Sequence, residues 1–248
     1  LLNNIAYQPV SNLIKSLTYS NGLTETNVHT LDYEQSQCTV SNGGTPVMGL
    51  TFGRTDNLNL TSIGDTVTPA NTQSFGYSAA NRLNSASGPY GSQSWTYDGV
   101  GNRTGETTGG VTDTYTYPAT SNRLQGVTRS GVTPDPRAFT YDGAGNIATD
   151  ARSGVSYAYT YNNANELATA SQTSSQLATY GYDPQHLRVS KVSAEGSILY
   201  HYDDGGRLLQ ETTSTGVLIR AYVWADEIPV AQITKTPTGE TLVYLHTD

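Results

Sequence analysis

Residues 95–103 read WTYDGVGNR and residues 139–147 read FTYDGAGNI, so the two stretches agree at six of nine positions. Each stretch has two aromatic residues spaced two apart, followed by aspartate, glycine and asparagine. Residues two apart on a strand point to the same face, so both aromatic side chains of a copy share one face. Aspartate, glycine and asparagine favour tight turns. The pattern therefore predicts a strand that ends in a reverse turn.

The pattern recurs about every 20 residues along most of the chain, which is typical of a repeat architecture. The second aromatic residues of the copies fall at positions 77, 97, 117, 141, 161, 182, 202 and 224. Stacked copies would align these side chains into ladders on one face. The predicted structural aromatic residues are Tyr77, Trp95, Tyr97, Tyr115, Tyr117, Phe139, Tyr141, Tyr159, Tyr161, Tyr180, Tyr182, Tyr200, Tyr202, Tyr222 and Trp224.

The residues after each aromatic pair have turn chemistry. A carboxylate there can accept hydrogen bonds from nearby backbone amides, and glycine can take a positive φ. The predicted turn residues are Asp98, Gly101, Asp142, Gly145, Asp183, Asp203 and Gly206. The strand pattern resumes at Leu83, Ile147, Leu167 and Leu208, and a polar stretch such as Ser171 to Ser175 returns the chain. Each repeat is therefore predicted to be a β-hairpin.

A single hairpin is only marginally stable, whereas hairpins stacked edge to edge pair their backbones. We predict an all-β fold of tandem hairpins stacked into a coiling, shell-like sheet, with a β-propeller as the alternative. Residues 71–248 form the predicted array. Residues 1–70 hold degenerate or irregular repeats, with copies LTYSNGL at 17–23 and LTFGR at 50–54 around an irregular stretch near Val40 to Pro46.

Composition limits the classes of function. The chain has 18 tyrosines and 25 glycines, and its formal charge of −8 disfavours nucleic acid and anionic lipid as partners. It contains no apolar run approaching the roughly 18 residues of a membrane-spanning helix. The lone Cys38 provides neither an internal disulfide nor a metal cluster. The start of the chain has no signal-peptide pattern and no methionine, so we expect a fragment of a longer protein.

The string Tyr-Asp-x-x-Gly-Asn/Arg, with an aromatic residue two positions before the tyrosine, resembles the YD repeat over about residues 70–248. This repeat belongs to Rhs proteins, the B and C components of insecticidal toxin complexes, and teneurins. The segment from Tyr200 onward, including YDDGGRL at 202–208 and YLHTD at 244–248, looks like the end of an Rhs core.

The resemblance implies a hollow β-shell, with many tyrosines on its inner side, that encloses an unfolded C-terminal toxin. The implied partners are that toxin, the remaining shell repeats and the secretion machinery, and the implied location is secreted or on a bacterial cell surface. The family's plug, self-cleavage site and toxin have no counterpart in this sequence, so no catalytic residue is carried over.

We predict no catalytic, cofactor or metal site. Asp203 and Asp204 are adjacent, but they fall in the turn of a repeat, where side chains of successive residues diverge. The sequence has no nucleophile elbow and no phosphate-binding loop. The histidines are scattered without the spacing of a zinc site; they are His29, His186, His201 and His246.

Two other functions stay open from the sequence. Exposed aromatic faces beside Asn and Asp side chains can stack on sugars, so a cell-surface carbohydrate-binding or adhesion module is the second hypothesis. An enzyme is the third, with its chemistry in the first 70 residues, where His29, Asp32, Glu34 and Cys38 lie close in sequence. Neither of the Asn-x-Thr triplets, at Asn59 and Asn102, is assigned a glycan.

Overall fold

The structure, a computed structural model, describes residues 2–131 and 136–245. These residues form 23 β-strands and one short 3-10 turn, Pro69–Asn71. The predicted all-β class is therefore confirmed. In this part of the chain, no helix is long and apolar enough to cross a membrane. Residues 246–248, which belong to the predicted C-terminal motif, lie outside the described residues.

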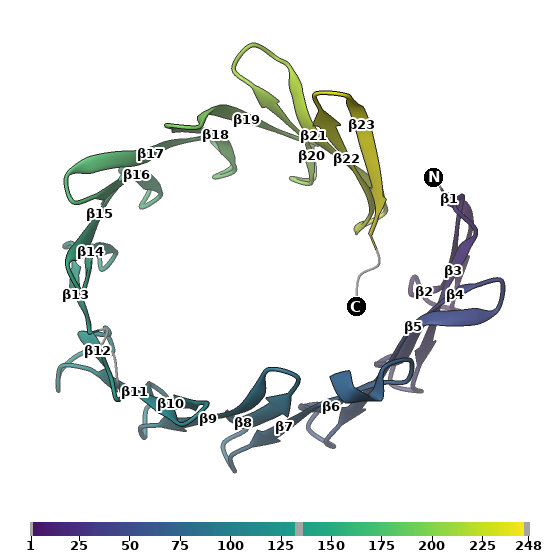
Figure 1. Cartoon of the computed structure of the whole chain (residues 1–248), viewed down its shortest axis with the longest axis horizontal. Helices are drawn as coiled ribbons and strands as arrows, with labels where there is room; N and C mark the ends of the chain where they lie inside the picture. The colour runs from purple at the N-terminus through teal and green to yellow at the C-terminus, as the bar shows by residue number, and fades with distance from the viewer. Residues whose placement is uncertain (1, 132–135, 246–248) are drawn as a thin grey trace. The chain divides into compact units, whose positions relative to one another are not determined.

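The chain divides into two compact units, Leu1–Thr114 and Tyr115–Thr247. In the first unit, each strand pairs antiparallel with the next strand in the sequence (Figure 1). Its strands are β1 (Leu2–Tyr7), β2 (Ile14–Tyr19), β3 (Leu23–His29), β4 (Gln35–Asn42), β5 (Thr45–Arg54), β6 (Leu60–Asp65), β7 (Gln73–Tyr77), β8 (Leu83–Gly88), β9 (Gly91–Tyr97) and β10 (Arg103–Thr108). Strand β11 (Val111–Thr116) crosses the boundary between the units.

The second unit repeats this arrangement, with every strand antiparallel to its neighbour in the sequence. Its strands are β12 (Gly126–Arg129), β13 (Arg137–Tyr141), β14 (Ile147–Arg152), β15 (Val155–Tyr161), β16 (Leu167–Gln172), β17 (Ser175–Tyr182), β18 (Arg188–Ser193), β19 (Gly196–Tyr202), β20 (Leu208–Thr213), β21 (Leu218–Ala225), β22 (Ile228–Thr236) and β23 (Gly239–Tyr244). This uninterrupted pairing within each unit differs from the separate four-stranded blades of a propeller.

The hairpins begin and end where the sequence indicates. Strands β8, β14, β16 and β20 begin at the apolar residues predicted to resume the strand pattern. The polar stretch from Ser171 to Ser175 contains the two-residue connection between β16 and β17. Each unit is thus a meander in which longer turns after the aromatic pairs alternate with shorter connections at the opposite edge.

The stretch from Val40 to Pro46 is regular, contrary to our expectation. Val40 lies in β4 and Pro46 in β5, and the two strands are joined by Gly43 and Gly44. Both glycines have positive φ, 55° and 86°, which matches the twist required of a two-residue hairpin turn. The repeat signal was weak here because the turn is built from glycine without aspartate. The predicted boundary at residue 70 stays a prediction.

The two faces of the sheet differ in chemistry. Along β15, Tyr157, Tyr159 and Tyr161 are half-buried, whereas the intervening Ala158 and Thr160 are exposed. We call the tyrosine-bearing side of each unit the aromatic face. The opposite face has small and hydroxylated residues, and the Thr160 hydroxyl lies 2.7 Å from that of Thr169 on β16.

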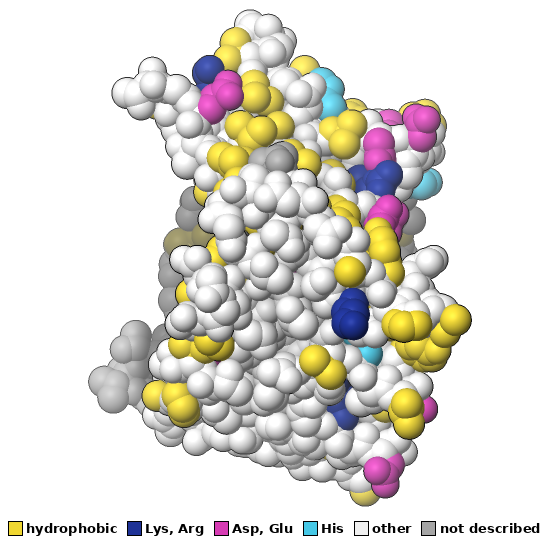
Figure 2. Space-filling model, turned by 90° about the vertical axis from the view of Figure 1, so that its right-hand side faces the viewer, with side chains coloured by type: hydrophobic (Ala, Val, Ile, Leu, Met, Phe, Trp, Pro, Cys, Tyr) yellow, Lys and Arg dark blue, Asp and Glu magenta, His cyan; other side chains and the backbone are white. Residues whose placement is uncertain are grey.

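Among residues 2–131 and 136–245, the substantial contacts between elements all join neighbours in the sequence, so no second layer of secondary structure covers either face. Fully buried large side chains cluster on β2 and β4, where Leu17, Tyr19, Cys38 and Val40 are at most 2% exposed. On the face drawn in Figure 2, hydrophobic side chains form small patches separated by backbone, other side chains and a few charged groups. Each unit is therefore stabilised mainly by the pairing of neighbouring strands, and only locally by a buried core.

Candidate functional site

In several copies, one carboxylate organises the turn after the aromatic pair. Asp98 Oδ1 accepts hydrogen bonds from the backbone amides of Val100 (3.1 Å) and Asn102 (2.8 Å). Its Oδ2 accepts a third from Asn102 Nδ2 at 2.9 Å. Asp142 makes the same three bonds to the residues two and four positions on, at 3.0, 2.8 and 3.0 Å. Predicted turn residues Asp183 and Asp203 also accept the two backbone bonds.

Other copies keep this turn with different residues. Asn162 accepts the same two backbone bonds through Oδ1. Thr30 and Thr55 each accept one bond through Oγ1, from the amide four residues on, at 3.2 Å. In the turns that begin at Thr30, Thr55, Ser78, Asp98, Asp142, Asn162, Asp183 and Asp203, the fourth residue has a positive φ. It is glycine at 101, 145 and 206, and the non-glycine examples are Tyr33, Leu58, Asn81, Asn165 and His186.

These hydrogen bonds favour the ionised carboxyl groups. The Asn146 side chain, and then its backbone amide, lower the pKa of Asp142. The backbone amide and guanidinium of Arg207 lower the pKa of Asp203. Desolvation opposes ionisation of Asp98, but the hydrogen bonds from Asn102, together with those from the Gly101 and Val100 amides, outweigh it, and the pKa of Asp98 is also lowered. The carboxylates are therefore structural acceptors, and their environment does not raise their pKa toward that of a general acid.

The second aromatic residue of most pairs connects one repeat to the preceding one. The Tyr97 hydroxyl donates to the Leu83 carbonyl at 2.7 Å, and the Tyr161 hydroxyl donates to the Ile147 carbonyl at 3.0 Å. The acceptor is the first residue of the second strand of the preceding hairpin. Equivalent bonds join Tyr77 to Leu60, Tyr141 to Leu124, Tyr202 to Arg188, and the Trp224 indole to Leu208.

The predicted aromatic residues occupy equivalent places in the repeat. The first of each pair lies inside a strand, and the second usually ends it. The strand-ending residues are Tyr77, Tyr97, Tyr141, Tyr161, Tyr182 and Tyr202, while Tyr117 follows β11 and Trp224 is the next-to-last residue of β21. Burial is the main cause that raises the pKa of Tyr161, Tyr182 and Tyr202.

Arginine side chains cover several of these rings. Arg188 lies over Tyr200 at 4.8 Å and over Tyr180 at 5.6 Å from the ring centroids. Arg137 lies over Phe139 at 4.9 Å, in the range of cation–π interactions. Arg82 lies 5.8 Å from the Tyr97 ring, and its Nη1 also donates to the Asp98 carbonyl. Guanidinium groups thus link neighbouring turns and occupy ring faces.

Two carboxylates are buried on the aromatic face of the second unit. Asp150 is opposite Phe139 in the β13–β14 register and is 3% exposed. Burial opposes its charge, but hydrogen bonds from Arg137 and Arg152 outweigh this effect and lower its pKa. Glu211 accepts hydrogen bonds from Arg220 and Tyr222. These charges are paired, as buried charges must be to avoid a large desolvation cost.

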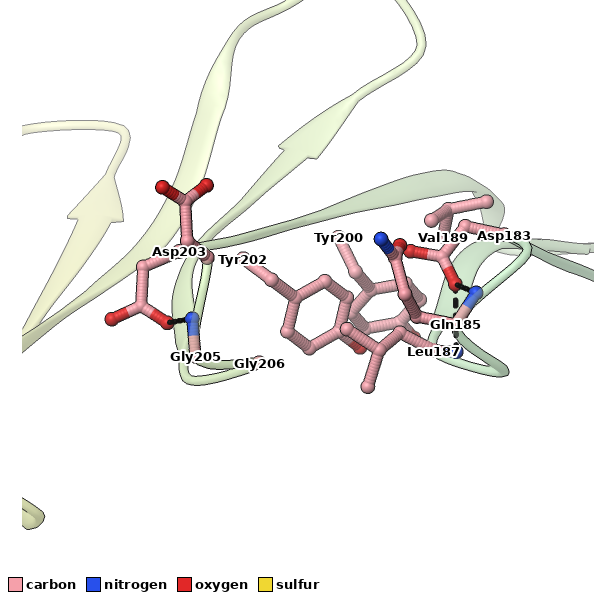
Figure 3. Close-up of a pocket in the computed structure, with 10 residues that line it drawn as sticks. Asp183, Gln185, Leu187, Val189, Tyr200, Tyr202, Asp203, Gly205 and Gly206 are labelled. Carbon is pink, nitrogen blue, oxygen red and sulfur yellow. Dashed lines mark hydrogen bonds between the residues drawn. The ribbon is translucent and has the colours of Figure 1, made fainter.

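A groove of about 520 Å³ lies between consecutive turns of the second unit. Figure 3 shows the Tyr200 and Tyr202 rings between the loop that carries Asp183 and the loop that carries Asp203, and both residues line the groove. Both of these carboxylates bond to backbone amides of their own turns. A second groove, of about 400 Å³, has the same position in the repeat between the turns at Thr30 and Thr55. The grooves follow from the stacking of turns.

The candidate residues of the first 70 positions do not form one site. Cys38 is fully buried on β4 opposite Asn27, whereas Asp32 lies in the turn between β3 and β4. Glu34 is directed toward Arg54, with 3.7 Å between Oε2 and Nε. Among the described residues, no group of three or more His, Cys, Asp and Glu side chains could hold a metal ion.

The hydroxyl-to-carbonyl bonds and the Arg137–Asp150–Arg152 cluster were not predicted from the sequence. Part of the cluster could have been predicted, because Asp150 and Arg152 are two residues apart on one strand and therefore lie on the same face. Arg137 joins them only through the register of β13 and β14.

No family model matches the chain, and no curated protein matches it. Its fold is similar to part of a crystal structure of TcdB2-TccC3-TEV, with a TM-score of 0.53 and 13% sequence identity over 98% of this chain and 18% of that chain. A pore structure of the Photorhabdus luminescens Tc holotoxin gives a TM-score of 0.45 and 12% identity, over 91% of this chain and 15% of that chain. This chain therefore spans less than a fifth of the length of these proteins.

Proposed function

We propose that this chain is a wall segment of an Rhs-type shell that encloses a C-terminal toxin and is secreted or displayed by a bacterium. The observation that carries the proposal is the ladder of aromatic pairs on one face, joined from repeat to repeat by hydroxyl-to-carbonyl bonds. A wall needs a lateral repeat of this kind and chemically different inner and outer faces. The similarity to part of TcdB2-TccC3-TEV supports the fold on which the proposal depends.

The proposed role is structural rather than catalytic. The aspartates that could act as acids or bases recur in equivalent turns, and their hydrogen bonds are made to their own backbone. Catalysis requires one distinctive arrangement of groups with a nucleophile or base near a reacting position. Toxin activity would belong to the enclosed partner, and the remaining wall would come from further repeats.

Enclosure can be tested with two neighbouring residues of β18. Lys191 is opposite Tyr180 and lies on the aromatic face, whereas Val192 lies on the other face and is 47% exposed. The variants Lys191→Cys and Val192→Cys are made in a Cys38→Ala background, because Cys38 is the only native cysteine. Each is made in the 248-residue chain and in the full-length gene product, and labelled with a polyethylene-glycol maleimide too large to enter a closed shell.

We expect both cysteines to react in the chain alone. In the full-length protein, labelling at position 191 should fall at least tenfold, while labelling at position 192 should persist. Equal labelling of the two positions in the full-length protein would contradict an enclosing wall with an inward aromatic face.

A carbohydrate-binding module is the second candidate, favoured by the groove that Tyr200 and Tyr202 line (Figure 3). The groove combines aromatic rings with a few polar groups, a composition typical of small-molecule sites. Arg188 already covers one Tyr200 face, which reduces the ring area that a sugar could contact. The test is binding of the protein to a glycan array. Binding that the Asp204→Ala change abolishes would support this function over the wall, because Asp204 lies outside the hydroxyl-to-carbonyl ladder.

A further inference from the structure

Charge is distributed unevenly over the second unit between β13 and β21. The aromatic face there carries five cations and two carboxylates: Arg137, Arg152, Arg188, Lys191 and Arg220, with Asp150 and Glu211. The connections between these strands carry six carboxylates and one arginine: Asp142, Glu166, Asp183, Glu195, Asp203 and Asp204, with Arg207. The chain is acidic as a whole, yet this face has an excess of positive charge.

The excess is not neutralised by ion pairs on the face. Asp150 is shared by two arginines, with its Oδ2 2.5 Å from Arg137 Nη2 and 2.9 Å from Arg152 Nη2. Within the described part of the chain, neither Arg188 nor Lys191 has a carboxylate within ion-pair distance. Three positive charges therefore remain uncompensated between β13 and β19.

These charges are accessible to a partner. The side chains of Arg137 and Arg152 are 35% and 43% exposed, and Arg188 is exposed. The guanidinium groups of Arg137, Arg152 and Arg188 lie 4.8 to 5.0 Å from ring centroids. A partner that approaches the face would meet guanidinium groups and ring edges.

We propose that the aromatic face between β13 and β21 binds an extended, acidic segment of polypeptide. The inference rests on the proposed function, because it assigns a chemistry to the part of the enclosed partner that touches this wall. Arg152 on β14 and Lys191 on β18 are four strands apart, or about 19 Å at the usual strand spacing. An extended chain covers that distance in about six residues, so carboxylates at such intervals could meet both charges.

The same features argue against single-stranded nucleic acid. Bases bind such surfaces by stacking on open aromatic faces, whereas guanidinium groups already cover Phe139, Tyr157 and Tyr200. A phosphate at every nucleotide would also be repelled by the carboxylates of the flanking turns. A polypeptide can place a few carboxylates opposite the cations and uncharged residues elsewhere.

Fluorescence anisotropy on the 248-residue chain tests the proposal. The probes are fluorescein-labelled Gly-Ser peptides with glutamate at every sixth position, and matched peptides with glutamine or lysine instead. We expect the glutamate peptide to bind about tenfold more tightly than the glutamine peptide at low salt, and the difference to disappear at high salt. The lysine peptide should bind most weakly.

The double variant Arg188→Gln/Lys191→Gln should abolish the preference for glutamate. Lys235→Gln is the matched control, because Lys235 lies on β22 on the opposite face and pairs with Glu240. The charge-reversed variant Arg188→Glu/Lys191→Glu should prefer the lysine peptide, a gain that unfolding could not produce. Circular dichroism checks that each variant keeps its strand content.

Equal binding of the glutamate and lysine peptides would overturn the proposal. So would tighter binding of an oligothymidylate than of the glutamate peptide, or a preference that the charge-reversed variant leaves unchanged. If the cysteine at position 191 is protected in the full-length protein but the peptides show no charge preference, the proposal of an enclosing wall is supported and the proposal of an acidic partner is wrong. If that cysteine is not protected, the wall itself fails.

Discussion

The region of β2 to β4 and the region of β13 to β16 build the same repeat from different sources of stability. The first buries Leu17, Tyr19, Cys38 and Val40 almost completely. Its turn at Thr30 accepts only one side-chain hydrogen bond, and Tyr33 takes the left-handed conformation. The second region has half-buried rings.

In that second region, the turn at Asp142 has three carboxylate hydrogen bonds, and Gly145 supplies the positive φ. The repeat is therefore defined by its backbone geometry, and several kinds of side chain can stabilise that geometry. Where apolar burial is available, the turn tolerates a threonine and a strained residue. Where the sheet is thin, the turn and the ladder of hydroxyl groups contribute more of the stability.

Truncation in the buried region should have the largest effect. Leu17→Ala removes a side chain that is 1% exposed and should destabilise the first unit by about 3 kcal/mol, the usual cost of an unfilled core cavity. Ile147→Ala is the matched change in the second region and should cost much less, because Ile147 is 36% exposed. Urea denaturation followed by circular dichroism measures both, and equal losses would remove the contrast between the regions.

Acid should weaken the turns organised by a carboxylate, such as the one in the second region, before those organised by a threonine. The pKa values of Asp142 and Asp203 are lowered in the fold, so their stabilisation is fully present above the unfolded pKa of about 3.9. It is lost as the pH falls through the lower folded values. Hydrogen exchange between pH 5 and pH 2.5 should therefore show the turn amides at Asn146 losing protection, while those at Asn59, bonded to a threonine, change little.

Loss of the turn acceptor should matter more where the acceptor is a carboxylate than where it is a threonine hydroxyl. Asp142→Ala removes three hydrogen bonds, whereas Thr55→Ala removes one. We expect the fall in thermal midpoint to be roughly twice as large for the first variant. Asp142→Asn is a useful control, because Asn162 makes the two backbone bonds natively. If Asp142→Asn is as harmful as Asp142→Ala, charge rather than acceptor geometry stabilises the turn.

The hydroxyl-to-carbonyl bonds of the ladder can be tested one at a time. Tyr161→Phe removes the bond to the Ile147 carbonyl and should cost about 1 kcal/mol. Tyr182→Phe is the internal control, because within the described residues the Tyr182 hydroxyl has no hydrogen-bond partner, and it should be nearly neutral. Equal effects of the two changes in chemical denaturation would argue that ring packing alone holds the repeats together.

The smallest effect concerns backbone strain. Leu58 has φ of 62°, and its side chain is 56% exposed, so little packing is lost on its removal. Leu58→Gly should relieve strain of about 1 kcal/mol, partly offset by the greater freedom of glycine in the unfolded chain. Gly101→Ala, at the same place in the strict repeat, should destabilise. If Leu58→Gly also lowers the thermal midpoint of the protein, the packing of Leu58 against its turn contributes to stability.

The local features of the fold were predictable from sequence because each depends on a few adjacent residues. Trp95, Tyr97 and Asp98 indicate a strand and its turn in any context, and Leu83, Ile147, Leu167 and Leu208 mark where strands resume. The β4–β5 hairpin was missed because Gly43 and Gly44 form a turn without the aspartate signal. The fourth residue of several turns was also hard to recognise, since Tyr33 and Leu58 rarely adopt positive φ.

The repeat period, the alternation along the strands, the shared face of each aromatic pair and most of the turns can be predicted from the residues alone. The folded chain is needed to know which carbonyl a tyrosine hydroxyl reaches, where the grooves between turns lie, and which arginines gather around Asp150. The physical reason is that these contacts join strands whose relative register is set by backbone pairing across the sheet. A shift of one residue in that register would turn every side chain to the other face.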